Sequence, residues 1–283
     1  MSRFATLSRA VEVNGIGLHS GQQVRTTLCP TETAGLCFAR VDLPDAPTVQ
    51  ADWRHVTSTT HATTLEDGAA RAVTTEHLLA ALWASGITHC RIELDAPEVP
   101  ILDGSARGWC RAIADAGTRE LAGERPILEL REPVWIQQGE AHVLGVPAPD
   151  FRVSVAVNFD APHAPMQMFD GVITPTNFAR EIADARTFTL QSWLEPLQNA
   201  GLIKGGSLDN AIVIDDNGWS SPPRVANELA RHKALDVVGD LSLLFGTSSF
   251  VGHIIATRAG HGAHRLWMEA CRGQNALRIG GQN

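Results

Sequence analysis

Three residues that can bind a cation or hold charge recur at every fourth position in the C-terminal half of the chain: His232, Asp236 and Asp240. On an α-helix this spacing places their side chains on one face, while the apolar residues between them can face a core. An imidazole and a carboxylate one turn apart can both reach a divalent cation, and zinc accepts this ligand pair. Two ligands do not complete a site, and a solvated helix face with a His–Asp contact is the alternative interpretation.

A second helix signal supplies a candidate third ligand and a candidate base. Glu76 and His77 follow a threonine, which favours a helix start, and precede the apolar run at 78–82. An acidic residue in a first helical turn also has an ordinary explanation, because negative charge is favoured there. With His232 and Asp236, however, His77 would complete a three-ligand site with a fourth position open for water. Glu76 would then be the carboxylate able to deprotonate that water.

The elements that must position these residues follow from periodicity and from turn residues. We expect the His232 helix at 222–241, because Pro222 and Pro223 suit a helix start. Each half then has the same order: several strands, a helix with candidate ligands, a strand and a last helix. Alternation and turn residues predict strands at 11–13, 24–28, 37–41, 90–94, 127–130, 134–137, 142–146, 153–159, 211–214 and 250–257. Further helices are predicted at 106–116, 177–185 and 191–200 and through 266–268.

Composition restricts the class of protein. The chain has 283 residues, 44% hydrophobic and 19% charged, which is typical of a compact globular protein of one or two domains. Its net charge of −8 and pI near 5.7 argue against nonspecific nucleic-acid binding. No apolar run is long enough for a transmembrane segment and the start lacks a signal peptide, so the cytoplasm is the expected location. Five cysteines without a close pair argue against disulfides.

An ordered series of short motifs gives the chain a family resemblance. From about residue 3 to the last helix, the sequence resembles the UDP-3-O-acyl-N-acetylglucosamine deacetylases of lipid A biosynthesis. The motifs are Gly17-Leu18-His19-Ser20-Gly21, Thr75-Glu76-His77-Leu78, Pro100-Ile101-Leu102-Asp103-Gly104-Ser105, Ala185-Arg186-Thr187-Phe188, the segment 205–211, Arg231-His232-Lys233 with Asp236 and Asp240, and Ala259-Gly260-His261. Such a series is far more specific than any one short motif.

The resemblance implies an α+β fold of two similar two-layer α/β sandwich domains with the metal site in the cleft between them. We place the N-terminal domain at 1–122 and the C-terminal domain at 127–283, because the polar segment 118–125 reads as a boundary before Pro126. An insertion at about 190–214 would form an apolar passage for an acyl chain. The implied reaction is zinc-dependent removal of acetate from the 2-acetamido group of UDP-3-O-(3-hydroxyacyl)-N-acetylglucosamine.

The resemblance also assigns roles to residues. His77, His232 and Asp236 would hold zinc, with iron(II) as the alternative metal. Glu76 would be the general base, and His261 would protonate the departing amine. The remaining catalytic assignments are Asp240, which would orient a histidine, Thr187, which would stabilise the oxyanion, and Lys233, which would flank the metal and bind phosphate.

Substrate contacts are expected from a cleft histidine, an aromatic residue that stacks on uracil, a cation near the diphosphate and two apolar residues of the passage. These are His19, Phe159, Arg258, Leu202 and Ile203. The chain departs from the family pattern at His264, where asparagine is usual, at Asn158, and at His163 in the segment after Phe159. These changes affect substrate recognition more than metal binding.

Two other functions fit the same residues. A paralogous enzyme could deacetylate another amino sugar or nucleotide sugar, and a noncatalytic protein could bind a nucleotide sugar or lipid precursor with the same fold. The partner that the family resemblance implies is a small molecule, a nucleotide-sugar lipid precursor, and not a nucleic acid. The sequence gives no oligomeric state. A binder would have no need of the base Glu76 and the acid His261 beside a metal, which favours an enzyme.

Overall fold

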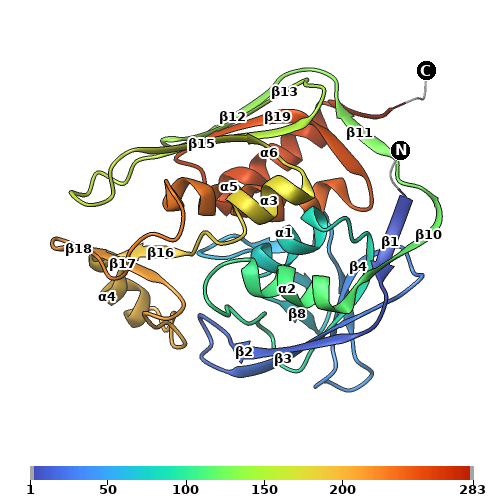
Figure 1. The fold of residues 1–283 in the computed structure, drawn as a ribbon, viewed down its shortest axis with the longest axis horizontal. Helices are drawn as coiled ribbons and strands as arrows, with labels where there is room; N and C mark the ends of the chain where they lie inside the picture. The colour runs from blue at the N-terminus through green and yellow to red at the C-terminus, as the bar shows by residue number, and fades with distance from the viewer. Residues whose placement is uncertain (1–2, 281–283) are drawn as a thin grey trace.

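The computed structural model describes residues 3–280, which form four layers in the order sheet, helices, helices, sheet (Figure 1). The lower sheet in Figure 1 comes from the first hundred residues and has the strand order β2-β3-β9-β4-β5. These strands are β2 (Val11–Ile16), β3 (Gln23–Cys29), β9 (His89–Leu94), β4 (Gly35–Arg40) and β5 (Thr48–Gln50). Helices α1 (Glu76–Ala84) and α2 (Arg107–Ala116) lie on its inner side.

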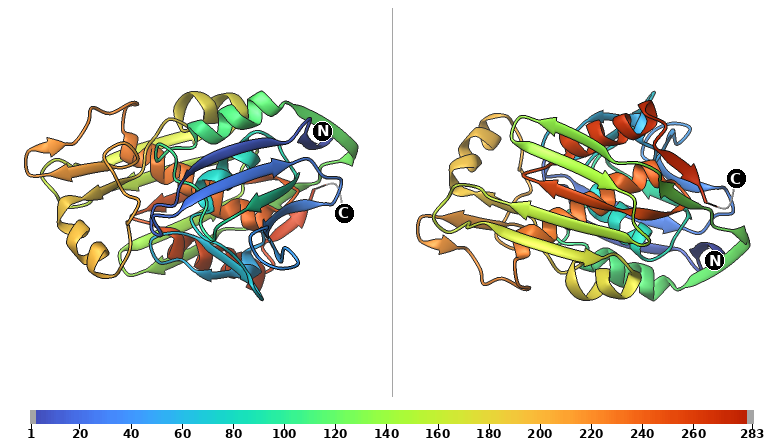
Figure 2. Two further views of the ribbon diagram at one scale, coloured as in Figure 1. Left: turned by 90° about the horizontal axis from the view of Figure 1, so that it is seen from below. Right: turned by 90° about the horizontal axis from the view of Figure 1, so that it is seen from above.

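The upper sheet comes from the second half of the chain, and Figure 2 shows its outer face. Its strands are β11 (Ile127–Leu130), β12 (Val134–Gln138), β13 (Ala141–Val146), β14 (Phe151–Val157), β15 (Gln167–Val172), β19 (Ser249–Thr257) and β20 (Leu277–Ile279). Strand β19 is central, because it pairs with β11, β13 and β14. Helices α3 (Pro175–Glu181), α5 (Glu228–Phe245) and α6 (His261–Gly273) lie beneath it. The mixed α/β architecture of two similar layered units agrees with the predicted fold class.

Helix α5 lies in the middle of this stack, between the upper sheet and α1. Strands β14 and β19 each bury alternate residues against it, as expected for a sheet with one covered face. Helix α5 is buried on nearly all sides, including His232, Asp236 and Asp240. The polar stripe is therefore not a solvated helix face, and a buried charged stripe requires partners.

Smaller sheets complete the fold. Strand β1 (Arg3–Leu7) pairs with β10 (Thr118–Glu124), and β6 (Val56–Ser58), β7 (Thr64–Asp67) and β8 (Ala70–Ala72) form a sheet after the 3₁₀ turn η1 (Trp53–His55). Strands β16 (Phe188–Leu190), β17 (Ile212–Asp215) and β18 (Gly218–Trp219) form another sheet beside α4 (Gln191–Asn199). This last unit projects from the stack in Figures 1 and 2 and contains the predicted insertion.

The predicted start of the His232 helix was wrong. Helix α5 begins at Glu228, not at the prolines, because the carbonyl oxygen of Pro222 accepts a hydrogen bond from Arg186 and the segment stays a loop. The polar segment 118–125, where the domain boundary was predicted, is largely the strand β10, since β1 supplies its hydrogen-bond partners. His261 is the first residue of α6. The domain limits 1–122 and 127–283 stay a prediction.

No helix within residues 3–280 is both long and apolar enough to cross a bilayer.

Candidate active site

Helices α1 and α5 cross in the middle of the stack, and their facing sides carry the residues that the sequence singled out. Glu76 and His77 come from the first turn of α1, and the stripe of His232, Asp236 and Asp240 comes from successive turns of α5. All five side chains are buried. The tertiary structure therefore brings together two short motifs that lie more than a hundred residues apart.

The three predicted metal ligands form one cluster. The ligand atoms of His77, His232 and Asp236 all lie within 4.8 Å of one another. The Nε2 atoms of His77 and His232 lie 3.7 and 3.5 Å from Oδ1 of Asp236, and the two imidazole rings meet edge to face with centroids 5.0 Å apart. Two neutral imidazoles and a carboxylate are a ligand set typical of a catalytic zinc site.

The hydrogen bonds of this cluster fit a cation. Oδ1 of Asp236 is buried, faces both imidazoles and has no hydrogen-bond partner among the described residues. Nδ1 of His232 donates to the carbonyl oxygen of Ala185 at 3.1 Å, which leaves Nε2 for the cluster. Burial lowers the pKa of His232 to about 3, so its ring is neutral. Lys233 donates to Oδ2 of Asp236 at 2.8 Å and lies over the ring of Phe188.

Glu76 lies beside this cluster as a buried carboxylate. The backbone amide of Thr63 donates to its Oε2 at 3.1 Å, and Nε2 of His261 lies 3.9 Å from its Oε1. Burial raises the pKa of Glu76 above its ordinary value, which makes the carboxylate a better proton acceptor than an exposed glutamate. The sequence contained no signal for the Thr63 contact.

Asp240 holds two histidines at once. Its Oδ2 lies 2.7 Å from Nδ1 of His261 and 2.6 Å from Nδ1 of His264, and its Oδ1 accepts a hydrogen bond from the hydroxyl of Thr63 at 2.6 Å. Burial alone would lower the pKa of His261, but the carboxylates of Asp240 and Glu76 outweigh it and raise the pKa to about 10. His261 is therefore protonated in the metal-free chain. The departure at position 264 places a second imidazole on the same carboxylate.

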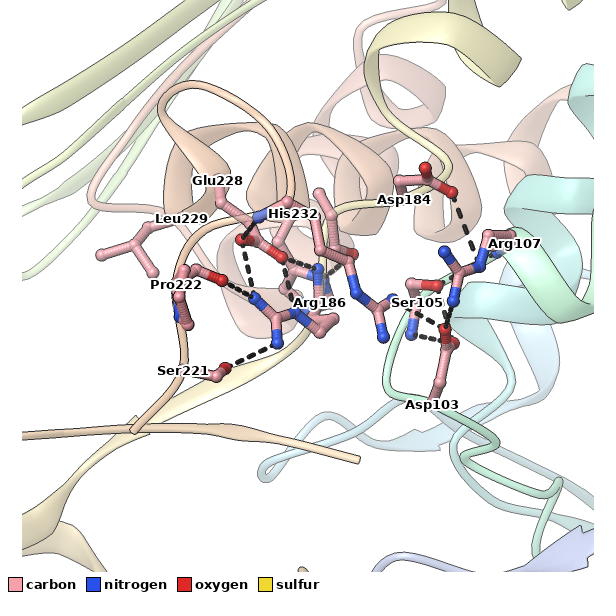
Figure 3. A network of polar contacts seen from close by, with 12 residues as sticks. Asp103, Ser105, Arg107, Asp184, Arg186, Ser221, Pro222, Glu228, Leu229 and His232 are labelled. Carbon is pink, nitrogen blue, oxygen red and sulfur yellow. Dashed lines mark hydrogen bonds and ion pairs between the residues drawn. The ribbon is translucent and has the colours of Figure 1, made fainter. Parts of the chain in front are cut away.

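Thr187 lines the same cavity from the segment that precedes β16. Its backbone amide donates to the carbonyl oxygen of Gly104 at 2.7 Å, so the N-terminal half holds it in place. The preceding residue, Arg186, forms a buried ion pair with Glu228 (Figure 3). Thr187 lines this cavity together with His232 and Lys233.

A cavity of about 440 Å³ connects this site to the projecting unit of β16, α4 and β17. Its far walls are mainly apolar and include Trp193, Leu194, Leu197, Leu208 and Val213. Such a passage suits an aliphatic chain, since apolar surface is buried favourably against apolar walls.

The predicted substrate residues are not all on this cavity. His19 and Ile203 line it, whereas Leu202 does not. Phe159 lies behind the wall, with ring centroids 5.0 Å from Phe188 and 5.9 Å from Trp193. Arg258 is paired with Asp160 at 2.6 Å, outside the lining.

Two residues that sequence reasoning missed shape the cavity. His61, with φ of 63°, lines it together with His19. Glu98 is buried and accepts hydrogen bonds from the amides of His19 and Ser20 at 2.9 and 2.7 Å and from the hydroxyl of Thr74 at 2.9 Å. These contacts position the Gly-Leu-His-Ser-Gly segment, and because they join distant parts of the chain no local pattern indicates them.

Comparison with known proteins matches most of the chain. Residues 5–271 match the family model described as UDP-3-O-acyl N-acetylglycosamine deacetylase. A UDP-3-O-acyl-N-acetylglucosamine deacetylase of Nostoc sp. is 44% identical over 266 residues, which cover 92% of this chain and 94% of the relative. Proteins of the same description from Thermosynechococcus vestitus and Myxococcus xanthus are 43% and 42% identical, covering 92% of this chain and 90% and 84% of the relatives.

Proposed function

This chain belongs to the UDP-3-O-acyl N-acetylglycosamine deacetylase family, and we propose that its reaction takes place where α1 and α5 cross, with zinc held by His77, His232 and Asp236. The chain is a hydrolase that removes the 2-N-acetyl group of UDP-3-O-acyl-N-acetylglucosamine in lipid A biosynthesis. The observation that carries the site assignment is the buried three-residue cluster with Glu76 and His261 beside it. Iron(II) is the alternative metal.

Each side chain of the site has a separate role in the reaction. A bound zinc ion would act as a Lewis acid towards the amide carbonyl and towards water. Glu76 takes the proton of the attacking water, because it is a buried carboxylate at the edge of the ligand cluster. The hydroxyl of Thr187 donates to the oxyanion of the tetrahedral intermediate. His261, held by Asp240, gives its proton to the amine nitrogen as the C–N bond breaks, and acetate and a free amine result.

The substrate assignments follow the cavity. We propose that the acyl chain lies along the apolar walls of the projecting unit, including Ile203, with Leu202 behind them. Lys233 binds substrate phosphate and Arg258 lies near the diphosphate, while His19 is a cleft residue and Phe159 stacks on the uracil. The cytoplasm is the proposed compartment, since all five cysteines, which lie within the described residues, are free thiols, as is typical of a reducing environment.

The test compares acetate release by the zinc-loaded chain from the acylated UDP-sugar and from UDP-N-acetylglucosamine. We expect release from the acylated substrate and a loss of roughly 10²–10⁴-fold in kcat for Glu76→Gln. Glu132→Gln, at an exposed glutamate, is the matched control. Equal rates on both sugars would favour a paralogous deacetylase, and binding without release of acetate would favour the noncatalytic alternative. A Glu76→Gln variant with wild-type kcat would contradict the mechanism.

A further inference from the structure

The ion pair of Arg186 and Glu228 is buried behind the cavity wall (Figure 3). The side chains are only 8% and 0% exposed. Nε and Nη2 of Arg186 donate to the two carboxylate oxygens of Glu228 at 2.8 and 3.1 Å, and the backbone amide of Arg186 donates to Oε1 at 3.0 Å. Because two parallel bonds fix both distance and orientation, this pair holds the backbone at 186 in a set position relative to the first residue of α5.

The same pair also shapes the loop before α5. Nη1 and Nη2 of Arg186 donate to the hydroxyl of Ser221 at 2.7 Å and to the carbonyl oxygen of Pro222 at 2.8 Å. Glu228 accepts a further bond from the amide of Arg224 at 2.7 Å. Asn227 precedes the helix with φ of 50° and no side-chain cap, and the backbone amide of Leu229 donates to the side chain of Gln167 at 3.0 Å. The carboxylate of Glu228 adds a negative charge in the first turn of α5, where such a charge is favoured.

The residues on either side of Arg186 are tied to the active site. The carbonyl oxygen of Ala185 accepts the hydrogen bond from His232, and the amide of Thr187 donates to Gly104 in the N-terminal half. Three consecutive residues therefore connect a metal ligand, the start of the ligand helix and the opposite half of the molecule. A shift at 186 would be transmitted directly to the hydroxyl of Thr187.

We propose that Arg186 and Glu228 are positioning residues for deacetylation, which fix the hydroxyl of Thr187 relative to α5. This inference rests on the proposed function, in which Thr187 donates to the oxyanion. Arginine is required because lysine cannot bridge Glu228, Ser221 and Pro222 with one planar group. A buried ion pair is a poor source of stability, since the desolvation of both charges offsets their attraction, and geometry is the better reason for this one.

The experiment is a double-mutant cycle with zinc-loaded protein. Arg186→Lys and Glu228→Gln are each made alone and together with Thr187→Val, which replaces the hydroxyl by a methyl group of similar size. We expect each single variant to lower kcat by about 10- to 100-fold with KM within about threefold, since loss of one oxyanion donor costs on the order of 10²–10³. In the Thr187→Val background the same changes should lower kcat less than about twofold, because no hydroxyl remains to be misplaced.

Arg125→Lys is the matched control, because Arg125 is a buried arginine at the opposite end of α5 that donates to the carbonyl oxygens of Thr247 and Ser248. It should leave kcat unchanged. A readout without turnover is hydrogen exchange of the segment 185–190 in the zinc-free chain, which should quicken for Glu228→Gln and not for Arg125→Lys.

The proposal would be overturned if the variants lost equal kcat in the presence and absence of the Thr187 hydroxyl. It would also be overturned if their loss of kcat were explained by loss of bound zinc, or if hydrogen exchange of the segment 185–190 were the same in Glu228→Gln and in the wild type. An inactive wild type would contradict the proposed function instead, while the exchange measurement would still report on the ion pair.

Discussion

The backbone of Gly239 lies directly against the backbone of Glu76, so that a Cβ atom at position 239 would stand 2.1 Å from the carbonyl oxygen of Glu76. Only glycine allows α1 and α5 to cross this closely. The close crossing brings Glu76 and His77 of α1 within reach of the polar stripe of His232, Asp236 and Asp240 on α5.

The first prediction concerns this contact. Gly239→Ala should lower the free energy of unfolding by about 1–3 kcal/mol, because backbone atoms must move apart in a tightly packed interior. Thermal unfolding measures the loss, at roughly 2–4 °C per kcal/mol. Gly273→Ala is the control, since nothing lies within 4 Å of the corresponding Cβ at the end of α6. Equal melting temperatures for the two variants would contradict the close approach.

The second prediction concerns the pH dependence of kcat. If His261 is the proton donor, activity falls as pH rises through its pKa, which Asp240 and Glu76 raise in the metal-free chain against the lowering effect of burial. Asp240→Asn removes one of these charges, so the alkaline limb of the kcat profile should move to lower pH by roughly 1–3 units. The profile of the zinc-loaded variant between pH 6 and pH 11 tests this, and an unmoved limb would exclude His261 as the acid.

The third prediction concerns an ion pair between the two halves of the chain. Asp103, in the Pro-Ile-Leu-Asp-Gly-Ser motif, lies 2.6 Å from Nη1 of Arg224. Burial raises the pKa of Asp103, but the hydrogen bond from Ser105 and the contacts with Arg224 outweigh it and lower the pKa below its ordinary value. The pair therefore contributes stability above the unfolded pKa of about 3.9, and this contribution is lost as pH falls through the folded value.

We expect Asp103→Asn to lower the free energy of unfolding by about 1 kcal/mol at neutral pH, because the pair is partly exposed and solvent screens it. The difference from the wild type should shrink as pH falls below about 4. Urea unfolding at several pH values measures this, and Asp150→Asn, at an exposed carboxylate, serves as the control. A difference that grows in acid would show that the sign of the pKa shift is wrong.

The fourth prediction concerns removal of the metal. Zinc that binds only the folded chain should stabilise it by about 2.7 kcal/mol at a free concentration of 100 times its Kd. Chelation should therefore lower the melting temperature, and added zinc should restore it. His232→Ala should abolish this response, because it removes one of the clustered ligands. His163→Ala, at an exposed histidine, should retain it. A response unchanged by His232→Ala would place the zinc elsewhere.

The sequence by itself determined which polar residues share one face of α5 and where α1 begins. Spacing of four places His232, Asp236 and Asp240 on one helix face whatever surrounds it, and α1 begins at the predicted Glu76. Helical period and strand alternation are local properties of the sequence, so they can be predicted without the tertiary structure. The start of α5 could not be predicted in this way, because it depends on a contact between residues 42 positions apart in the chain. Arg186 binds both Glu228 and the carbonyl oxygen of Pro222, and this keeps Pro222 in a loop.

Only the tertiary structure decided which groups meet these side chains. The hydroxyl of Thr63 reaches Asp240 across 177 residues of chain, and His264 shares that carboxylate with His261. The sequence also could not decide whether the polar stripe of α5 faces solvent or α1, because the same spacing of residues is compatible with both arrangements. Burial between two sheets settled it, since a charged stripe removed from water must be paired or hold a cation.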